Sequence, residues 1–268
     1  MLNEIRKKTV KDFDDQWRLQ GKLDDDYWAS DQIFFDLFSN FFSIKKVKDN
    51  IIAEVGAGTG RLLKTLFKQN PKKVYAIEPS SSGIAAISNN FYDKKNLDII
   101  RSDGLRFKTS ELCDIIFSLG VIHHIKNPTD ILVNIKNNLK SKGIIIIWVY
   151  GYENNQLYIT FYKFLSFLTK NLPDKLVYKV ASILNILLYP YIYLCNFLNL
   201  PLKDYFLKVF NKCGWQKRKD IIFDQLNPIY SKYYKKKEIE KELLDAGFVN
   251  LKFYHHHSYS WLIVGENR

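Results

Sequence analysis

Residues 50–150 alternate short apolar runs with segments of helical periodicity, and no other feature of this 268-residue chain constrains its fold as strongly. Such alternation is typical of βαβ units that build a parallel sheet. All three prolines of the region fall in the expected connections, where a missing N–H does least damage. The predicted strands are Ile51–Val55, Val74–Ile77, Leu97–Ile100, Asp114–Ser118 and Ile144–Val149, and the predicted helices are Arg61–Gln69, Ser82–Phe91 and Thr129–Leu139. We therefore expect an α/β fold.

The flanking segments suggest how the rest of the chain is organised. Residues 1–49 are rich in aromatic side chains and are expected to form an N-terminal helical cap. Residues 152–220 are mostly apolar and are expected to form a helical insertion that acts as a lid. The tail is expected to be a helix ending at Gly247 and an antiparallel hairpin, Phe248–His255 with Ser260–Val264. The core would then comprise residues 50–151 and 221–268.

Within the insertion, Ala181–Leu200 approaches the length that crosses a bilayer. Pro190 and three asparagines weaken that interpretation. A lid docked on the core is favoured over membrane contact, and a spanning helix is disfavoured because sheet-forming sequence lies on both sides of it. Peripheral contact with the inner face of a membrane through residues 181–200 remains open.

Charge and cysteine content narrow the function classes. Forty basic and 28 acidic residues leave a formal net charge of +12, which admits anionic partners without choosing among them. Cys113, Cys195 and Cys213 lack the spacing of a zinc site or a disulfide framework, and the N-terminus has no apolar signal region, so a cytoplasmic location is expected. His255 to His257 alternate faces in a predicted strand, so they are not expected to converge on a metal.

A glycine-rich loop, Glu54-Val-Gly-Ala-Gly-Thr-Gly60, directly follows the first predicted strand and precedes a helix. Gly56 permits a sharp turn, Gly58 lets a ligand approach the backbone, and Gly60 allows close packing of helix and strand. This context predicts that a nucleotide-like ligand lies across the glycines.

Three carboxylates end three consecutive strands, namely Glu54, Glu78 and Asp103. Glu78 is placed to accept hydrogen bonds from ribose hydroxyls, and Asp103 from an adenine amine. Dinucleotide sites usually have GxGxxG spacing, which leaves helix N–H groups for a pyrophosphate. Here the spacing is GxGxG, and Glu54 would repel a pyrophosphate. A ligand with an ammonium and a sulfonium fits better, so S-adenosylmethionine is favoured over NAD.

With these motifs, residues 50–150 resemble the class I S-adenosylmethionine-dependent methyltransferases, whose core is Rossmann-like. EVGAGTGR resembles their first motif, AIEPS the second-strand acid, RSDG the third, and DIIFSLGVIHHIKNP with LKSKGIIIIWVYG the fourth and fifth strands. The resemblance implies S-adenosylmethionine as cofactor, S-adenosylhomocysteine as product, and a cofactor-binding set of Glu54, Gly56, Ala57, Gly58, Gly60, Glu78, Pro79, Ser80, Asp103, Gly104 and Leu119.

The flanks resemble one bacterial subset of that superfamily. They share an N-terminal F-x-x-x-W, here Phe13 to Trp17, a long apolar insertion, and a segment like FDQLNPIYSKYYKKKEIEKELLDAGF. Members of the subset are often associated with surface-glycan and secondary-metabolite pathways. This implies a role in capsule or polysaccharide biosynthesis.

Methyl transfer mainly requires orientation of the acceptor and removal of its proton. His123 and His124 follow the fourth strand, and a histidine can act as a base near neutral pH. We predict that His123 faces the pocket and that His124 is structural, with the alternative that neither touches the acceptor. Candidate acceptor-binding residues are Trp17, Tyr27, Tyr150, Asp224, Tyr230 and Tyr234, each with ordinary packing as the alternative.

Asn227-Pro-Ile-Tyr230 superficially resembles the NPPY motif of amino-methylating nucleic-acid enzymes, but that motif belongs after the fourth strand. Nucleic acid is therefore not the expected partner. The predicted function is transfer of a methyl group to an O or N atom of a small molecule or saccharide precursor, phosphorylated or saccharide-linked. The alternatives are an RNA or protein methyltransferase, and a non-catalytic S-adenosylmethionine-binding partner protein.

Overall fold

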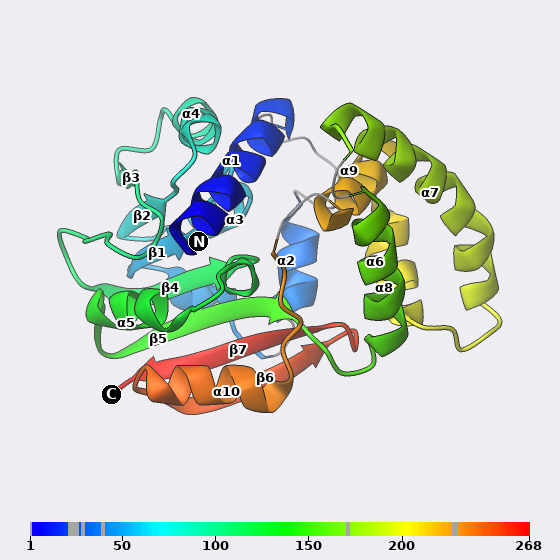
Figure 1. The fold of residues 1–268 in the computed structure, drawn as a ribbon. Helices are drawn as coiled ribbons and strands as arrows, with labels where there is room; N and C mark the ends of the chain where they lie inside the picture. The colour runs from blue at the N-terminus through cyan, green and yellow to red at the C-terminus, as the bar shows by residue number, and fades with distance from the viewer. Residues whose placement is uncertain (1, 21–26, 28–29, 39–40, 170–171, 227–229) are drawn as a thin grey trace.

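A seven-stranded sheet forms the centre of the computed structural model, which describes residues 2–20, 27, 30–38, 41–169, 172–226 and 230–268 (Figure 1). Its order is β3-β2-β1-β4-β5-β7-β6. The strands β1 to β5 are parallel, and β7 runs antiparallel to both β5 and β6. The bounds are β1 Ile51–Val55, β2 Lys73–Ile77, β3 Leu97–Ile100, β4 Cys113–Leu119, β5 Leu139–Tyr150, β6 Phe248–His256 and β7 Ser260–Asn267. The predicted α/β class and its antiparallel C-terminal hairpin are confirmed.

Helices cover both faces of the sheet and one end of it (Figure 1). Short 3-10 turns lie between them, among them η2 Ile44–Val47, η3 Ile122–His124 and η4 Phe210–Lys212. The helices are α1 Leu2–Gln20, α2 Asp31–Phe38, α3 Arg61–Phe67, α4 Ser81–Asn90, α5 Thr129–Asn137, α6 Gln156–Thr169, α7 Asp174–Cys195, α8 Lys203–Lys208, α9 Trp215–Leu226 and α10 Lys236–Asp245.

Two apolar cores flank the sheet because alternate residues of each strand point to opposite faces. Ile52 and Phe117 face the core that contains α2 and α3. Their neighbours Ala53 and Ile116 face the core that contains α5 and α10. Burial on both faces explains why the central strands are almost continuously apolar in sequence.

Several predicted helix ends differ from the structure by one or two residues, and the end of α5 has a clear physical cause. The helix expected over 129–139 ends at Asn137, because Leu139 already pairs with Cys113 as the first residue of β5. Asn138 stands between the two elements, where its side-chain oxygen accepts a hydrogen bond of 2.9 Å from the Thr109 N–H. Pairing with a strand that is distant in sequence therefore overrides a local helical pattern.

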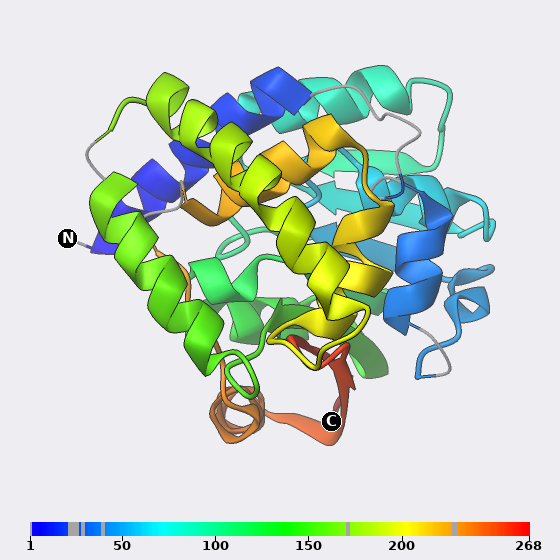
Figure 2. The same ribbon diagram turned by 90° about the vertical axis from the view of Figure 1, so that its right-hand side faces the viewer.

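The helices α6 to α9 lie together beyond the carboxyl ends of the parallel strands, at the right of Figure 1 and the front of Figure 2. Val177 and Ala181 of α7 pack against Phe223 and Leu226 of α9. This packing carries α9 past residue 220, so the expected end of the lid at that position falls inside a helix.

Candidate functional site

A cavity of about 1030 Å³ lies between the carboxyl ends of the parallel strands, α1 and the helices α6 to α9. Open α/β sheets bind ligands at this edge. Nine of the predicted cofactor-binding residues line the cavity: Glu54, Gly56, Ala57, Gly58, Glu78, Pro79, Asp103, Gly104 and Leu119. The structure thus brings together residues that lie up to 65 positions apart in sequence.

The glycine-rich loop is held by backbone hydrogen bonds to the neighbouring strand. The N–H groups of Gly56 and Ala57 donate to the carbonyl oxygen of Ile77, at 2.8 and 3.1 Å. Gly58 has a φ of 55°, and a Cβ at this position would lie 3.1 Å from the indole of Trp17. A larger residue would therefore strain the backbone and fill space between the loop and α1.

Glu78 is buried and is held by three donors. Its Oε2 accepts from the Gly58 N–H at 2.8 Å, and its Oε1 accepts from the N–H and hydroxyl of Ser80 at 3.0 and 2.6 Å. Burial raises the pKa of Glu78, although these hydrogen bonds oppose the rise. Ser80 caps α4 by accepting from the Gly83 N–H and does not line the cavity, so it positions Glu78.

Two predicted cofactor residues therefore support the site from outside the cavity. Ser80 is one, and Gly60 is the other. Gly60 has a φ of 87°, and a Cβ there would lie 2.5 Å from the Phe91 ring. Its role is to let α3 begin close to Phe91 at the end of α4, whereas the prediction was close packing of the helix against the strand.

Glu54 is buried at the end of β1, and its Oε2 has no hydrogen-bond partner among the described residues. Burial raises the pKa of Glu54 well above its usual range, although the charge of Arg61 opposes the rise. A buried carboxylate without a partner is costly unless a donor or a cation satisfies it. The ammonium group of an amino-acid ligand meets that need.

Asp103 ends the third acid-bearing segment and forms an ion pair with Arg6 of α1, at 3.2 Å. Its other oxygen accepts from the Leu105 N–H at 3.2 Å. Asp14, also on α1, accepts a hydrogen bond of 2.8 Å from the Ser82 N–H at the start of α4. These contacts hold α1 against α4 (Figure 1), and Arg6 and Trp17 of α1 line the cavity.

The two histidines after β4 are placed the other way round from the prediction. His124 lines the cavity, whereas His123 is fully buried and does not. The reason is the 3-10 turn at Ile122–His124, which directs the ring of His123 under Tyr150, 3.9 Å away between centroids. Both ring nitrogens of His123 lack partners within the described part of the chain, and burial lowers its pKa well below the usual range.

His124 is anchored on one side. Its Nδ1 lies 3.0 Å from the Tyr230 carbonyl oxygen and 3.2 Å from the Ser231 hydroxyl, and its ring contacts Phe13 edge-on. When Nδ1 carries the proton that the carbonyl accepts, Nε2 carries the lone pair. Burial lowers the pKa of His124 to about 4, although the Tyr230 hydrogen bond opposes the shift, so the ring is neutral at pH 7.

The lid side of the cavity is lined by tyrosines that share one amide. Gln225 donates to the Tyr150 hydroxyl at 2.7 Å, and its Oε1 accepts from Tyr158 and Tyr233 at 3.0 and 3.2 Å. Tyr150 was predicted from the sequence, whereas the other three residues were not. The available signal was the density of tyrosines in residues 150–234, which does not reveal which of them face inward.

Asp224 also lines this side, and its Oδ1 has no partner in the part of the chain that the structure describes. Burial raises the pKa of Asp224 to about 7, although the charge of Lys217 opposes the rise. The carboxyl group is therefore near its midpoint at neutral pH. A group in that state can both accept and release a proton.

Trp17, Tyr150 and Asp224 are the predicted acceptor residues that line the cavity, and three others lie outside it. Tyr234 is fully buried in the core beside α10, and Lys232 lies over its ring. Tyr27 is buried near Lys212, and Tyr230 lines no part of the cavity. Asn227 lies outside the described residues.

Residues 53–147 match the family model described as a methyltransferase domain. The chain therefore carries a methyltransferase domain, and its fold is that of methyltransferases of known structure. The prediction of S-adenosylmethionine as cofactor is confirmed with it. The unpartnered Glu54 oxygen and the open approach at Gly58 fit this cofactor.

Similar proteins in sequence include the tRNA U34 carboxymethyltransferase of Helicobacter pylori, which is 30% identical over 136 residues, or 48% of this chain and 49% of that protein. The tRNA U34 carboxymethyltransferase of Vibrio cholerae is 25% identical over 134 residues, or 49% and 41%. The chain spans about half the length of these relatives.

Similar solved structures include the N-methyltransferase NodS of Bradyrhizobium japonicum, with a TM-score of 0.55, 12% identity, and coverage of 97% of this chain and 98% of that one. A methyltransferase of Aquifex aeolicus that depends on S-adenosylmethionine gives a TM-score of 0.50 at 15% identity, covering 87% and 92%. At these identities the likeness establishes a shared fold and nothing finer.

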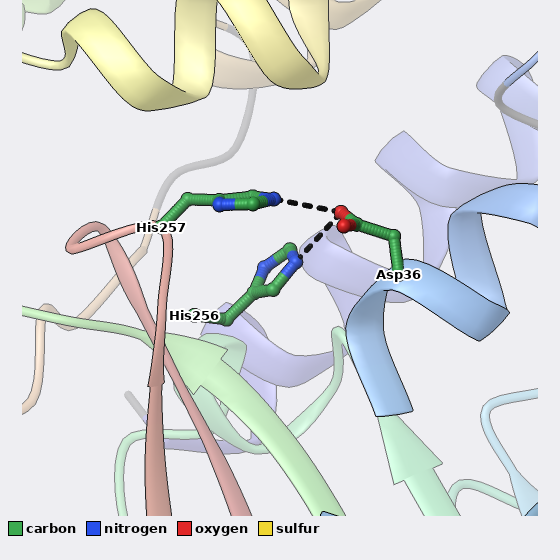
Figure 3. Close-up of side chains that lie close together, drawn as sticks. All are labelled: Asp36, His256 and His257. Atoms are coloured by element: carbon green, nitrogen blue, oxygen red, sulfur yellow. Dashed lines mark hydrogen bonds and ion pairs between the residues drawn. The ribbon is translucent and has the colours of Figure 1, made fainter. Parts of the chain in front are cut away.

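Outside the cavity, Asp36 joins two of the three consecutive histidines (Figure 3). As expected, the three do not all converge on one point. Asp36 Oδ2 lies 3.0 Å from His256 Nε2 and 2.7 Å from His257 Nε2. They converge because β6 ends at His256, and His257 has a φ of 43° in the following turn. His255 instead stacks on Trp261. The three atoms lie within 4.8 Å of one another, close enough for a cation, but hydrogen bonds alone account for them.

Proposed function

We propose that this protein transfers a methyl group from S-adenosylmethionine to an O or N atom of a small molecule or saccharide precursor bound on the lid side of the cavity. The observation that carries the proposal is the continuity of one cavity. It joins the acids of the cofactor side, Glu54 and Glu78, to the tyrosines and Asp224 of the lid side.

When bound, S-adenosylmethionine supplies a methyl carbon already activated by a sulfonium. Glu54 would pair with the ammonium group of the cofactor, Glu78 with its ribose hydroxyls, and Asp103 with the adenine amine. The ion pair between Asp103 and Arg6 would then open or be shared. Trp17, close to Gly58, would help exclude water from this side.

On the lid side, the chain has two groups able to take the acceptor's proton. Asp224, with a pKa of about 7 and an unpartnered oxygen, is the better base near neutral pH. The neutral His124, with a pKa of about 4, is the weaker base and suits hydrogen bonding to the acceptor. His123 has no access to the cavity and would act as a positioning residue, through its contact with Tyr150.

RNA is the second candidate acceptor. The relatives named above act on tRNA, according to their names, and the net charge of +12 suits a polyanion. This runs against the expectation that nucleic acid is not a partner. The helices that roof the lid side favour a small acceptor, because a structured RNA would need access to the cavity that they cover.

The decisive experiment incubates the full chain with radiolabelled S-adenosylmethionine and a cell extract separated into small-molecule, RNA and protein fractions. We expect label in the small-molecule fraction, and its mass would identify the acceptor. Label in the RNA fraction, with methyl transfer that weakens steeply as the salt concentration rises, would show that RNA and not a small molecule is the acceptor. Cofactor binding without labelling of any fraction would contradict an enzymatic role.

A further inference from the structure

The outer faces of α6 and α7 expose apolar side chains at helical spacing. Phe161, Phe164 and Leu168 of α6 follow one another at three and four residues, and Ile183, Leu187 and Leu194 of α7 at four and seven. These six residues, here called the lid face, are between 44% and 62% exposed. Both helices lie at the front of Figure 2, away from the sheet. Apolar patches of this extent usually mark interaction sites.

The opposite faces of the same helices are apolar as well. Ile159 and Tyr162 of α6 are buried, as are Val177 and Ala181 of α7. A helix that is apolar on two opposite faces is normally covered by protein or lipid on both. Within the described structure, these two helices have protein on one side and solvent on the other.

The attachment of α7 to the protein fixes its orientation. Within the described residues, Lys175–Cys195 is the one helical segment long and apolar enough to cross a membrane. Its inner face packs against Phe223 and Leu226, and Asn185 donates to the Trp215 carbonyl oxygen at 3.2 Å. A helix bound to the core along one side lies flat on a surface instead of crossing it.

The charges around the lid face are almost all positive. Residues 156–202 contain four lysines and one acidic residue, Asp174. Lys163, Lys175 and Lys179 are exposed. Basic residues beside an exposed apolar helical face are typical of helices that bind anionic membrane surfaces.

We propose that the lid face docks onto the surface of an anionic lipid bilayer, with α6 and α7 lying in the interface. A second copy of the chain fits less well, since a two-fold contact would set the same lysines against each other. Docking of this kind does not depend on the proposed chemistry. It would, however, bring the lid side of the cavity to the membrane surface, because Tyr158 of α6 and Tyr178 of α7 line it.

The test is flotation of the full-length protein with vesicles of phosphatidylcholine alone or mixed with phosphatidylglycerol. We expect flotation with the mixed vesicles, weaker with phosphatidylcholine and reduced by salt. The paired substitution Phe164→Glu with Leu187→Glu should lower partitioning about tenfold or more, because it removes apolar contact and adds negative charge. Lys163→Gln with Lys179→Gln should mainly weaken the part of vesicle binding that salt reduces.

The matched control is Tyr92→Glu with Leu112→Glu, two exposed apolar residues in regions away from the lid face, at 88% and 49% exposure. It should leave flotation unchanged. Calorimetric affinity for S-adenosylmethionine should be the same in all variants, which shows that each is folded. Wild-type protein that stays with the buffer would overturn the proposal. The proposal would also be overturned if the control pair lost as much vesicle binding as the Phe164→Glu, Leu187→Glu pair. A third contrary result would be a dimer in solution that Phe164→Glu with Leu187→Glu dissociates, in a protein that does not bind vesicles.

Discussion

At the scale of single residues, burial gives the carboxylates of the cavity their chemical properties. Glu54, Glu78 and Asp224 each have a raised pKa with burial as its largest cause. The three carboxylates differ in the hydrogen bonds that they accept. Glu78 has three donors, whereas Glu54 and Asp224 each retain an oxygen without a partner among the described residues. The carboxylate of Glu78 is therefore held in a fixed orientation, whereas those of Glu54 and Asp224 each have an oxygen that can accept a hydrogen bond from a ligand.

Glu78→Gln should weaken S-adenosylmethionine binding about tenfold or more, because a hydrogen bond to a charged group contributes about 1.5–3 kcal/mol. Isothermal titration calorimetry measures this directly. Asp93→Asn, an exposed acid beside Lys94, is the control and should bind normally. Unchanged affinity in Glu78→Gln would remove this residue from the cofactor site.

Asp224→Asn should stabilise the protein at pH 8 and leave it unchanged near pH 4. The folded-state pKa of about 7 lies above the unfolded value, so the folded protein loses stability as pH rises from about 4 to 7. A tenfold change in proton affinity corresponds to about 1.4 kcal/mol, and water in the cavity reduces the effect, so we expect a gain of about 2 kcal/mol at pH 8. Urea unfolding at both pH values tests this. An equal effect at both would contradict the raised pKa.

At the scale of elements, Asp36 ties α2 to the turn between β6 and β7 (Figure 3). Burial alone would raise the pKa of Asp36, but hydrogen bonds from His256 and His257 hold it below its usual range. Burial lowers the pKa of His256, although Asp36 opposes the shift, so its neutral form is favoured in the fold.

Asp36→Ala should lower the free energy of unfolding at pH 7 by about 1–3 kcal/mol, because it leaves two largely buried donors without an acceptor. The lowered pKa means that the stability from Asp36 is present above about pH 4 and is lost as pH falls below it. Denaturant unfolding at pH 7 and pH 3 should show a difference that shrinks at the lower pH. If a cation bound to Asp36, His256 and His257, a chelator would lower the free energy of unfolding of the wild type and leave that of Asp36→Ala unchanged.

At the scale of the whole molecule, the cavity depends on parts that are distant in sequence. The sheet edge supplies the acids, α1 covers them, and the lid helices supply the tyrosines and Asp224. A cofactor that binds across these parts should stabilise them together. At 100 times its Kd, S-adenosylmethionine should add about 2.7 kcal/mol, which corresponds to a rise in Tm of about 5–10 °C for a chain of this size.

Differential scanning fluorimetry with and without S-adenosylmethionine measures this rise. Glu78→Gln should lose most of it at the same cofactor concentration. A rise of the same size in that variant would show that the cofactor stabilises the protein through other contacts.

The sequence by itself determined the parts of this protein that depend on local order. Strand-helix alternation over 50–150 predicted the parallel sheet, and the glycine loop after β1 with acids at successive strand ends predicted the cofactor. Parallel strands bring their carboxyl ends to one edge, so spacing along the chain was enough.

Only the tertiary structure decided which side chains face the cavity from turns and from the lid. The 3-10 turn at Ile122–His124 turned His123 inward and left His124 at the cavity. The left-handed backbone at His257 let two neighbouring histidines meet Asp36. Tyr158, Tyr233 and Gln225 came together through helix packing. In each case, the direction of a side chain depends on contacts between segments far apart in sequence, and no local pattern encodes them.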